Sequence, residues 1–418
     1  MNILDEVVST DWCVGCGMCA AICPKEKLKI EWNERGEYTP VEIDGAEPCN
    51  ENCSLCYQIC PAHGYTINET ELGAKLYADS PRIKYNMETG YYLASYVGYS
   101  QKHRLSSASG GLASWSLENL LSSGAVDAVA AVSRTSEQEK LFQFKICRSV
   151  EEIRACARSA YYPVEISQVI RFMLQNEGRY AVIGLPCVCK AIRLAQEKLS
   201  NLKKRICFVL GLTCGHQCSK FFSEYICSFG GGNPNELREI IFRTKDLSQS
   251  ASNHGIRFRS GGGKNDHRKR IFWKDGIGRA YSNGYFQIPG CFYCDDVFAE
   301  CADVTFMDAW LREYVQDPRG TSIILVRDIR IQKIIQQGRE DDELVLENLG
   351  ISKIIESQQN VLDKKRLRKM TTDPTPNMRL NHQKSLHPLM PDILKLKKTI
   401  SKKSSDIWKR NKMYTKLN

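Results

Sequence analysis

The sequence predicts an α+β protein with three parts: a small cysteine-rich N-terminal domain, an α/β body around a mixed sheet, and a basic C-terminal tail that we expect to be flexible. Two similar cysteine runs lie within residues 11–61. From about residue 91 to 340, short apolar segments alternate with amphipathic helical patterns, as in an α/β body with a buried sheet. The net charge is +10, and sixteen of the 58 lysines and arginines follow Asp363, so the basic character belongs to the tail.

Changes in composition set the predicted domain boundaries. The cysteine-rich module covers 1–70, a linker with Gly73, Pro81 and Gly90 covers 71–90, the α/β body covers 91–345, and the basic extension covers 346–418. A chain of 418 residues can bury more than one core without disulfide staples, although it has 19 cysteines. The first residues, MNILDEVVST, show no basic and apolar leader. We therefore expect a reducing, cytoplasmic location, where clustered cysteines are usually metal ligands.

Apolar patterns predict the elements in order. In the N-terminal module we expect strands at 28–32 and 38–43. In the body we expect strands at 91–100, 125–132, 142–147, 180–185, 205–212, 303–309 and 322–327, and helices at 110–123, 150–158, 165–176, 187–199 and 217–228. Residues 259–270 are typical of an exposed hairpin or loop, and beyond 370 we expect the chain to lose fixed packing. No apolar run approaches the roughly 20 residues that span a bilayer.

The two cysteine runs have the spacing of iron-sulfur ligands. The first, DWCVGCGMCAAICP (11–24), is CxxCxxCxxxCP, and the second, CNENCSLCYQICP (49–61), is CxxxCxxCxxxCP. In two-cluster ferredoxins each run gives three thiolates to its own cluster and its Pro-flanked cysteine to the other. We predict one [4Fe-4S] cluster on Cys13, Cys16, Cys19 and Cys60 and a second on Cys49, Cys53, Cys56 and Cys23. Structural zinc is the alternative, since CxxC pairs also bind zinc.

Four of the remaining cysteines lie where strands are expected to end. Cys187 lies in IGLPCVCKA, Cys214 in LGLTCGH, and Cys291 and Cys294 in PGCFYC. Strand ends of an α/β sheet gather at one edge, so these thiols could meet at a third cluster. The nearby alternatives are Cys189, Cys218 and Cys301. We interpret the cysteines in apolar patterns as core residues, because buried free cysteine acts as a small hydrophobe: Cys147, Cys156, Cys207 and Cys227.

A Ser/Gly segment precedes the first predicted helix of the body, in LSSASGGLASWSLENLL (105–121). Hydroxyls and backbone N–H groups at a helix N-terminus suit an anion such as a dinucleotide pyrophosphate. The alternative is structural: Ser109 caps the helix, and Gly110 and Gly111 allow close packing.

Taken in order, these motifs resemble a known family. The two cysteine runs, SSASGG, GLPCVCKA, LGLTCGH and CFYCDDVFAECADVTFMDAW resemble the family of beta subunits of coenzyme F420-reducing hydrogenases and F420-dependent formate dehydrogenases, which also includes a chlorophyll-cycle reductase. The resemblance covers about residues 5–340 and implies FAD in addition to two ferredoxin-type [4Fe-4S] clusters. It implies a third [4Fe-4S] cluster on Cys187, Cys214, Cys291 and Cys294. It also implies FAD contacts at Ser107, Ser109, Gly110 and Gly111, and it matches Asp308 to the acidic residue before Trp310. Asp308 would hold a flavin hydroxyl or cap a turn.

The resemblance implies an iron-sulfur flavoprotein oxidoreductase. Electrons would pass between the clusters and an FAD that reacts with a two-electron carrier or substrate, with an electron-donor or acceptor protein or coenzyme as partner. The carrier would be F420-like or another acceptor, including one in cell-surface polysaccharide biosynthesis, because similar chains occur in bacteria beside such genes. Two other classes remain open: a non-catalytic electron-relay subunit without flavin, and a zinc-stabilised interaction protein.

The rest of the sequence carries weaker signals. No residue is marked as a general acid or base, and His216 beside Cys214 fits an ordinary satisfied histidine. The segment 391–410 sets apolar residues among lysines, a pattern that would allow peripheral contact with the inner membrane surface, while a solvated tail is the alternative. No nucleic-acid-binding motif is present.

Overall fold

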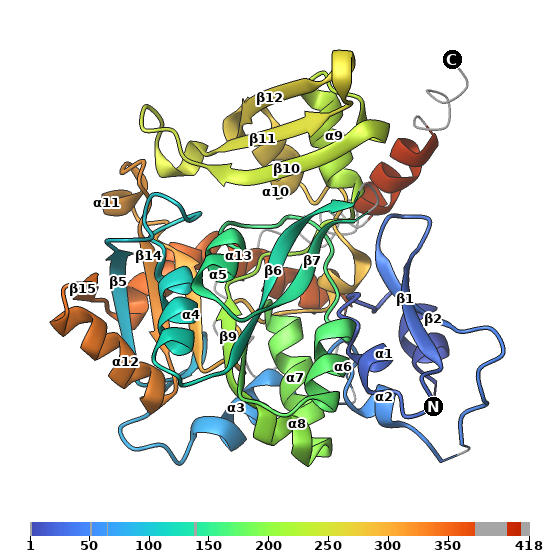
Figure 1. Cartoon of the computed structure of the whole chain (residues 1–418), viewed down its shortest axis with the longest axis horizontal. Coiled ribbons are helices and arrows are strands. Elements are labelled where there is room, and N and C mark those ends of the chain that lie inside the picture. Colours follow the sequence, from blue (N-terminus) through green and yellow to red (C-terminus); the bar gives the residue numbers. More distant parts are fainter. Residues whose placement is uncertain (1, 51, 65, 138–139, 373–398, 411–418) are drawn as a thin grey trace.

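A mixed eight-stranded sheet forms the centre of the protein. The computed structural model describes residues 2–50, 52–64, 66–137, 140–372 and 399–410. The central strands are β5 (Ala94–Ser100), β6 (Ala128–Glu137), β7 (Lys140–Cys147), β8 (Tyr180–Gly184), β9 (Ile206–Leu212), β13 (Val304–Asp308), β14 (Ser322–Val326) and β15 (Leu344–Asn348). Their order is β15-β5-β14-β13-β9-β8-β6-β7 (Figure 1). Neighbours from β13 to β6 are parallel, and the other pairs are antiparallel.

Helices cover both faces of this sheet, so its central strands are apolar throughout. All five residues of β8 are buried, which is typical of a strand buried on both faces. Alternate residues divide between two clusters: Val129 and Phe208 pack on one face, and Ala130 and Val209 pack on the other. The first face carries α4 (Leu112–Ser122), α5 (Val150–Ala155) and α12 (Ile329–Glu340), and the second carries α6 (Ser167–Gln175), α7 (Pro186–Lys198) and α13 (Ile351–Thr372). The short helices α8 (Ser200–Arg205) and α11 (Arg312–Val315) follow α7 and β13.

A smaller antiparallel sheet lies at one end of the body (Figure 1). It has the order β10-β11-β12, with β10 (Leu237–Thr244), β11 (Gly255–Ser260) and β12 (His267–Phe272). Its apolar core contains Phe222 on α9 (Phe221–Phe229), Phe242 on β10 and Ile277 on α10 (Ile277–Ser282). The hairpin expected at 259–270 is confirmed as the β11–β12 connection, whereas β10 was not predicted.

The N-terminal module packs directly on the body. It contains β1 (Leu28–Trp32) and β2 (Tyr38–Glu42), which confirm the two expected strands, and the short helices α1 (Met18–Ile22) and α2 (Leu55–Gln58). Ile166 N, just before α6, donates to Cys16 O at 2.9 Å. Met18, Ile22 and Ile59 lie in the same apolar cluster as residues of α6 and α7.

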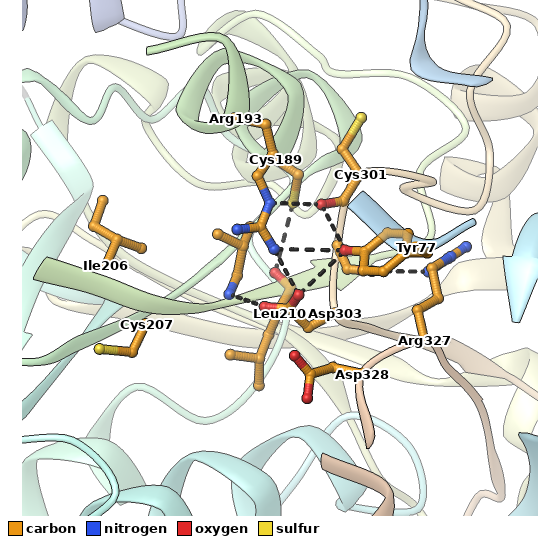
Figure 2. Close-up of polar contacts among 12 residues, drawn as sticks. Tyr77, Cys189, Arg193, Ile206, Cys207, Leu210, Cys301, Asp303, Arg327 and Asp328 are labelled. Atoms are coloured by element: carbon orange, nitrogen blue, oxygen red, sulfur yellow. Dashed lines mark hydrogen bonds and ion pairs between the residues drawn. The ribbon is translucent and has the colours of Figure 1, made fainter. Parts of the chain in front are cut away.

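The linker is fastened to the body by a buried polar network (Figure 2). It begins with α3 (Glu69–Tyr77) and continues into β3 (Lys84–Asn86) and β4 (Gly90–Tyr92). Asp303, at the start of the β13 region, accepts from Arg193 Nη2 on α7 at 2.6 Å, from Tyr77 Oη at 3.2 Å and from Val209 N on β9 at 2.7 Å. One carboxylate therefore joins α3, α7, β9 and β13. Burial raises the pKa of Asp303, while the Arg193 guanidinium works in the opposite direction.

The basic extension is ordered wherever the structure describes it. α13 packs through Ile354 and Leu362 against the sheet, and residues 399–410 form a helix. On that helix, Trp408 Nε1 donates to Glu224 at 2.9 Å and Lys402 pairs with Asp11. The expected loss of packing beyond 370 is therefore wrong for 399–410. The apolar residues Ile393, Leu394 and Leu396 of the expected membrane-contact pattern lie outside the described residues.

Three local expectations differ from the structure. The segment 91–100 is two strands, because Gly90–Tyr92 pairs with β3 and Ala94–Ser100 pairs with β14 and β15. The helix expected at 217–228 begins only at Phe221. The residues before it pair with another segment: Cys218 forms an isolated antiparallel β-bridge with Gln287, and Ser219 N donates to Phe286 O at 2.7 Å. Of the four cysteines interpreted as core, Cys147 and Cys227 are buried, but Cys156 and Cys207 are partly exposed.

Candidate iron-sulfur and anion-binding site

The first cysteine run forms a tight loop that requires glycine. Gly15 and Gly17 have φ angles of +67° and +82°, in the left-handed region that glycine favours. A Cβ atom on Gly15 would lie 2.6 Å from Tyr38 O. Gly17 is also the N-cap of α1. The loop thus carries Cys13 and Cys16 and passes straight into the helix that carries the next thiol.

The Pro-flanked cysteine of the second run lies with the first run. Burial, and then the nearby thiols of Cys16, Cys13, Cys60 and Cys56, raise the pKa of Cys19 well above its usual range. The pKa of Cys60 is also raised, by burial and then by the charges of Cys16 and Cys13. Cys60 therefore lies beside the thiols that are separated from it by more than 40 residues of chain.

Cys23, the Pro-flanked cysteine of the first run, lies with thiols of the second run. Burial raises the pKa of Cys56, and the charges of Cys23 and Cys53 act in the same direction. Cys49 is the exposed member of this run, and the contacts described for Cys56 do not include it. This is the arrangement that exchange of the fourth ligand between two clusters requires. Ligation itself stays a prediction.

Four body thiols meet in the interior. Cys187 is the second residue of α7, Cys214 follows β9 by two residues, and Cys291 and Cys294 lie in and just after the 3-10 turn Pro289–Phe292. Burial, and then the charges of Cys214, Cys16, Cys294 and Cys291, raise the pKa of Cys187 well above its usual range. The expectation that all four lie at strand ends is wrong, because Cys291 and Cys294 precede β13 in a turn. The structure nevertheless brings them together.

The other nearby cysteines are arranged differently. Cys189 Sγ lies 3.6 Å from Leu210 O and points into the backbone of β9 (Figure 2). Cys301 Sγ lies 3.9 Å from Glu69 O, on the side of α3. Cys218 is close enough to Cys291 and Cys214 for their charges to raise its pKa further after burial. The structure thus places Cys187 rather than Cys189 in the set, with Cys218 as a fifth neighbouring thiol.

The body thiols touch the N-terminal module through Gln217. This buried side chain donates through Nε2 to Cys187 Sγ at 3.5 Å and to Val14 O at 3.4 Å, and its backbone N donates to Cys291 Sγ at 3.3 Å. A Cβ atom on Gly290 would lie 2.5 Å from Cys13 O. The loop of the first cysteine run and the turn that carries Cys291 are therefore in direct contact.

The thiol sets can be compared with what a metal ion and a cluster each require. Within the described ranges, no three His, Cys, Asp or Glu side chains converge closely enough to hold one metal ion. A [4Fe-4S] cluster instead needs four thiolates around a four-iron core. In the body, Cys187 lies close enough to Cys214, Cys291 and Cys294 to interact with all three, a set of that number of thiols.

The Ser/Gly turn is already bonded to the sheet. Ser109 Oγ donates to Thr321 O at 2.8 Å, Gly110 N donates to Ser322 Oγ at 2.8 Å, and Ser107 Oγ lies 3.1 Å from Ser114 Oγ. Gly111, with φ of +82°, is the N-cap of α4. The alternative that Ser109 caps this helix is therefore wrong. The expectation that Gly110 allows close packing is confirmed, because a Cβ atom on Gly110 would lie 2.5 Å from Gly98 O.

Two cations at the end of β10, Arg243 on the strand and Lys245 just after it, contact this turn, and Arg243 joins it to Asp308. Arg243 forms a bidentate ion pair with Asp308 at 2.6 and 2.7 Å, and its Nη2 lies 3.4 Å from Ala108 O. Lys245 donates to Ser109 O at 2.6 Å and to Arg104 O. Burial, and then the charges of Arg243, Arg104 and Arg158, lower the pKa of Lys245 to about 7.

Arg243 and Lys245, with Thr244 between them, form a cationic group that has donors without a partner among the described residues. Arg243 Nε and Thr244 Oγ1 are buried and make no hydrogen bond within the described chain, and such groups usually have a partner. Sequence reasoning missed Arg243 and Lys245. The available signal was FRTKD, a cationic pair at the end of the unpredicted strand β10.

Aromatic rings connect the cationic group to the body thiols. Tyr281 stacks on His216 with ring centroids 4.0 Å apart and contacts Tyr161 at 5.4 Å. Tyr161 in turn contacts Arg243. His254 is buried against Trp273 at 4.9 Å, and burial together with Arg243 lowers the pKa of His254 to about 2. His254 is therefore neutral at physiological pH.

Comparison with known families agrees with this geometry. The family model for the C terminus of the coenzyme F420 hydrogenase/dehydrogenase beta subunit matches residues 177–351, the model for its N-terminal part matches residues 95–171, and a 4Fe-4S binding domain matches residues 6–26. The chain belongs to the family of coenzyme F420 hydrogenase/dehydrogenase beta subunits. Its ferredoxin-type N-terminus supports an iron-sulfur protein.

Two of the proteins similar to this chain come from archaea. A subunit of the F(420)H(2) dehydrogenase of Methanosarcina mazei is 25% identical over 214 residues, covering 50% of this chain and 55% of that protein. Coenzyme F420-dependent sulfite reductase of Methanocaldococcus jannaschii is 23% identical over 348 residues, covering 79% of this chain and 46% of that protein. The chain thus spans about half the length of these curated relatives.

Two further matches cover the parts separately. Ferredoxin-3 of a Nostoc species is 35% identical over 77 residues, which are 16% of this chain and 79% of that protein. A chain of the F420-reducing [NiFe] hydrogenase complex from Methanosarcina barkeri shares the fold, with a TM-score of 0.50 and 16% identity over 67% of this chain and 91% of that chain. Among the described residues of this family member, no helix is long and apolar enough to cross a membrane.

Proposed function

We propose that this chain is an iron-sulfur flavoprotein oxidoreductase that acts on a two-electron carrier or substrate. The observation that carries the proposal is the position of the body thiols between the N-terminal module and the cationic group. Gln217 joins them to the loop of the first cysteine run. On the other side, α13 contacts Asp308 O through Gln358 Nε2 at 2.9 Å and reaches Cys294 through Lys365. Seven residues separate these positions, which is about 10 Å along a helix.

The residues around the Ser/Gly turn fit an FAD. Arg243, Thr244 and Lys245 would hold its phosphates, since buried cations and unpaired donors favour an anion. Ser107, Ser109, Gly110 and Gly111 would shape the turn beneath them. Ser109 and Gly110 are bonded to Thr321 and Ser322 at the start of β14, and Ser107 is bonded to Ser114 on α4. When bound, FAD supplies the exchange between one-electron and two-electron chemistry.

The protein's own groups orient and shield this site. Asp308 fixes the Arg243 guanidinium through two parallel hydrogen bonds. Tyr161 and Tyr281 lie in contact between Arg243 and His216, and there they would exclude water from the path to Cys214. Lys245, with its pKa of about 7, would hold a proton beside a bound anion.

The carrier is proposed as F420-like, after the names of the relatives, or another two-electron acceptor, including one in cell-surface polysaccharide biosynthesis. The N-terminal module would receive or deliver electrons at a partner protein or coenzyme. A relay subunit is the second candidate, because one relative is named as a component of a dehydrogenase and one structural neighbour as part of a hydrogenase complex. Such a relay would carry iron but no flavin.

Anaerobic purification tests the cofactors first. We expect about 12 Fe per chain, four for each of three clusters, together with one extractable FAD. About 12 Fe without flavin would support the relay subunit, and zinc in place of iron would exclude both candidates. Reduced deazaflavin, NAD(P)H and reduced ferredoxin, added separately, should bleach the flavin band with only the true donor class.

Calorimetry of FAD binding to the flavin-free holoprotein tests the position of the phosphates. At pH 8 free Lys245 should be mostly neutral, so binding an anion should take up close to one proton. The uptake is measured from the dependence of the heat on buffer ionisation enthalpy. Lys245→Met should abolish it and weaken binding at least tenfold, whereas the exposed Lys269→Met control on β12 should change neither. Unchanged affinity and uptake in Lys245→Met would place the phosphates elsewhere.

A further inference from the structure

A lysine from the basic extension is buried among the body thiols. Lys365, on α13, is 2% exposed, and its Nζ donates to Cys294 Sγ at 3.3 Å and to Asp296 O at 2.5 Å. Cys214 and Cys291 also lie close enough to interact with its charge. In the sequence this residue lies in a run of three cations, Lys364 to Arg366, within the basic extension.

The lysine is not required to attach its helix. Ile354 and Leu362 of α13 are fully buried in an apolar cluster with residues of β5, β13 and β14. Ser357 and Gln358 bond the same helix to Asp308 O at 3.2 and 2.9 Å. Burial of an ammonium costs several kcal/mol unless an opposite charge lies nearby. The charges that face Lys365 are those of Cys294, Cys214 and Cys291 and of the buried Asp296 carboxylate, with Cys294 the strongest of them.

Cation placement has a known consequence for a cluster. Net charge, hydrogen bonds to the sulfurs and solvent exposure set the reduction potential of an iron-sulfur site. Reduction adds one negative charge to the cluster. A fixed ammonium that donates to one ligand sulfur stabilises that reduced form more than the oxidised form.

We propose that Lys365 is a positioning residue that raises the reduction potential of the body cluster through a charged hydrogen bond to Cys294. The inference rests on the proposed function only in assuming a cluster on Cys187, Cys214, Cys291 and Cys294. It assigns to the extension a role in electron transfer, since a higher potential favours electron transfer to this cluster.

A potentiometric titration of the full holoprotein, followed by electron paramagnetic resonance, tests the inference. The body signal is identified as the one lost in Cys291→Ser. Lys365→Met should reduce the ratio of reduced to oxidised body cluster at least tenfold at a fixed potential, about 59 mV for one electron. Lys365→Arg should retain most of the wild-type ratio, and the ferredoxin-type signals should not move.

Lys353→Met is the matched control, because Lys353 lies on the same helix with its side chain 46% exposed in a pair with Glu356. It should leave every potential unchanged. If Lys365→Met loses the cluster, Lys365→Gln, which keeps a neutral N–H donor, provides the measurement and should show the same direction of shift. An unchanged ratio in these variants at about 12 Fe would overturn the role of Lys365 alone. A wild-type protein with about 8 Fe would overturn the body cluster itself.

Discussion

The N-terminal thiols and the body thiols are assembled in two different ways. The N-terminal set comes from two short runs within residues 13–60, on a loop that needs Gly15 and Gly17. The body set comes from α7, the end of β9 and the turn before β13, over more than 100 residues of sequence. A local loop fixes the first set and only the packed sheet fixes the second. Spacing in sequence therefore predicts the former far better than the latter.

Loss of single thiols should show this difference most strongly. Cys291→Ser should remove about four Fe and leave both ferredoxin-type signals intact, because the body set shares no ligand with the N-terminal runs. Cys23→Ser should instead disturb the cluster on Cys49, Cys53 and Cys56 before the one on Cys13, Cys16 and Cys19. Iron analysis and electron paramagnetic resonance of the anaerobic variants measure both. Loss of the first cluster before the second in Cys23→Ser would contradict the exchange of ligands.

The assembled site should also depend on the buried network beneath it. Asp303→Asn leaves the Arg193 guanidinium buried without its carboxylate, and the two side chains are only 4% and 8% exposed. The cost of burying this charge cannot be avoided by deprotonation, because arginine stays protonated in proteins. The free energy of unfolding should fall by about 3–5 kcal/mol, and iron should leave the body cluster first.

Urea unfolding of the holoprotein, with circular dichroism and iron release as readouts, checks this expectation. The control is Asp127→Asn, which breaks the Arg179 pair at 2.6 Å with both side chains about half exposed. An exposed pair contributes at most about 1 kcal/mol. Equal losses in the two variants would mean that the network has no special role in holding α7 and β9 together.

The same contrast explains what the sequence could predict. Cysteine spacing and alternating apolar strands are local signals, so the N-terminal strands and β7, β8, β9, β13 and β14 were placed nearly correctly. The meeting of Cys187, Cys214, Cys291 and Cys294 needed the strand order as well. Arg243 and Lys245 were missed because β10 was not predicted and nothing in FRTKD marks which side chains are buried. Lys365 was missed because a run of cations reads as solvated unless its partners are known.

The two regions should also differ in their response to acid. Burial and Arg243 lower the pKa of His254 in the body to about 2, and burial lowers the pKa of His63 in the N-terminal module. A histidine with a depressed folded-state pKa gives no pH dependence above its unfolded value of about 6.5, because it is neutral in both states. Below that value the unfolded chain binds a proton that the folded chain refuses, so stability falls as pH falls.

His254 should therefore reduce body stability by about 2 kcal/mol between pH 7 and pH 5, at about 1.4 kcal/mol per pH unit below 6.5. His254→Phe, which keeps an aromatic ring against Trp273, should remove that part of the slope. Urea unfolding of the anaerobic holoprotein at the two pH values, compared with His63→Phe, measures the difference. His63 lies in the N-terminal module, with its Nε2 at 2.6 Å from Tyr57 O, so His63→Phe should leave the part of the slope that belongs to the body unchanged. A slope in His254→Phe equal to that of the unaltered protein would contradict this assignment of the acid sensitivity to His254.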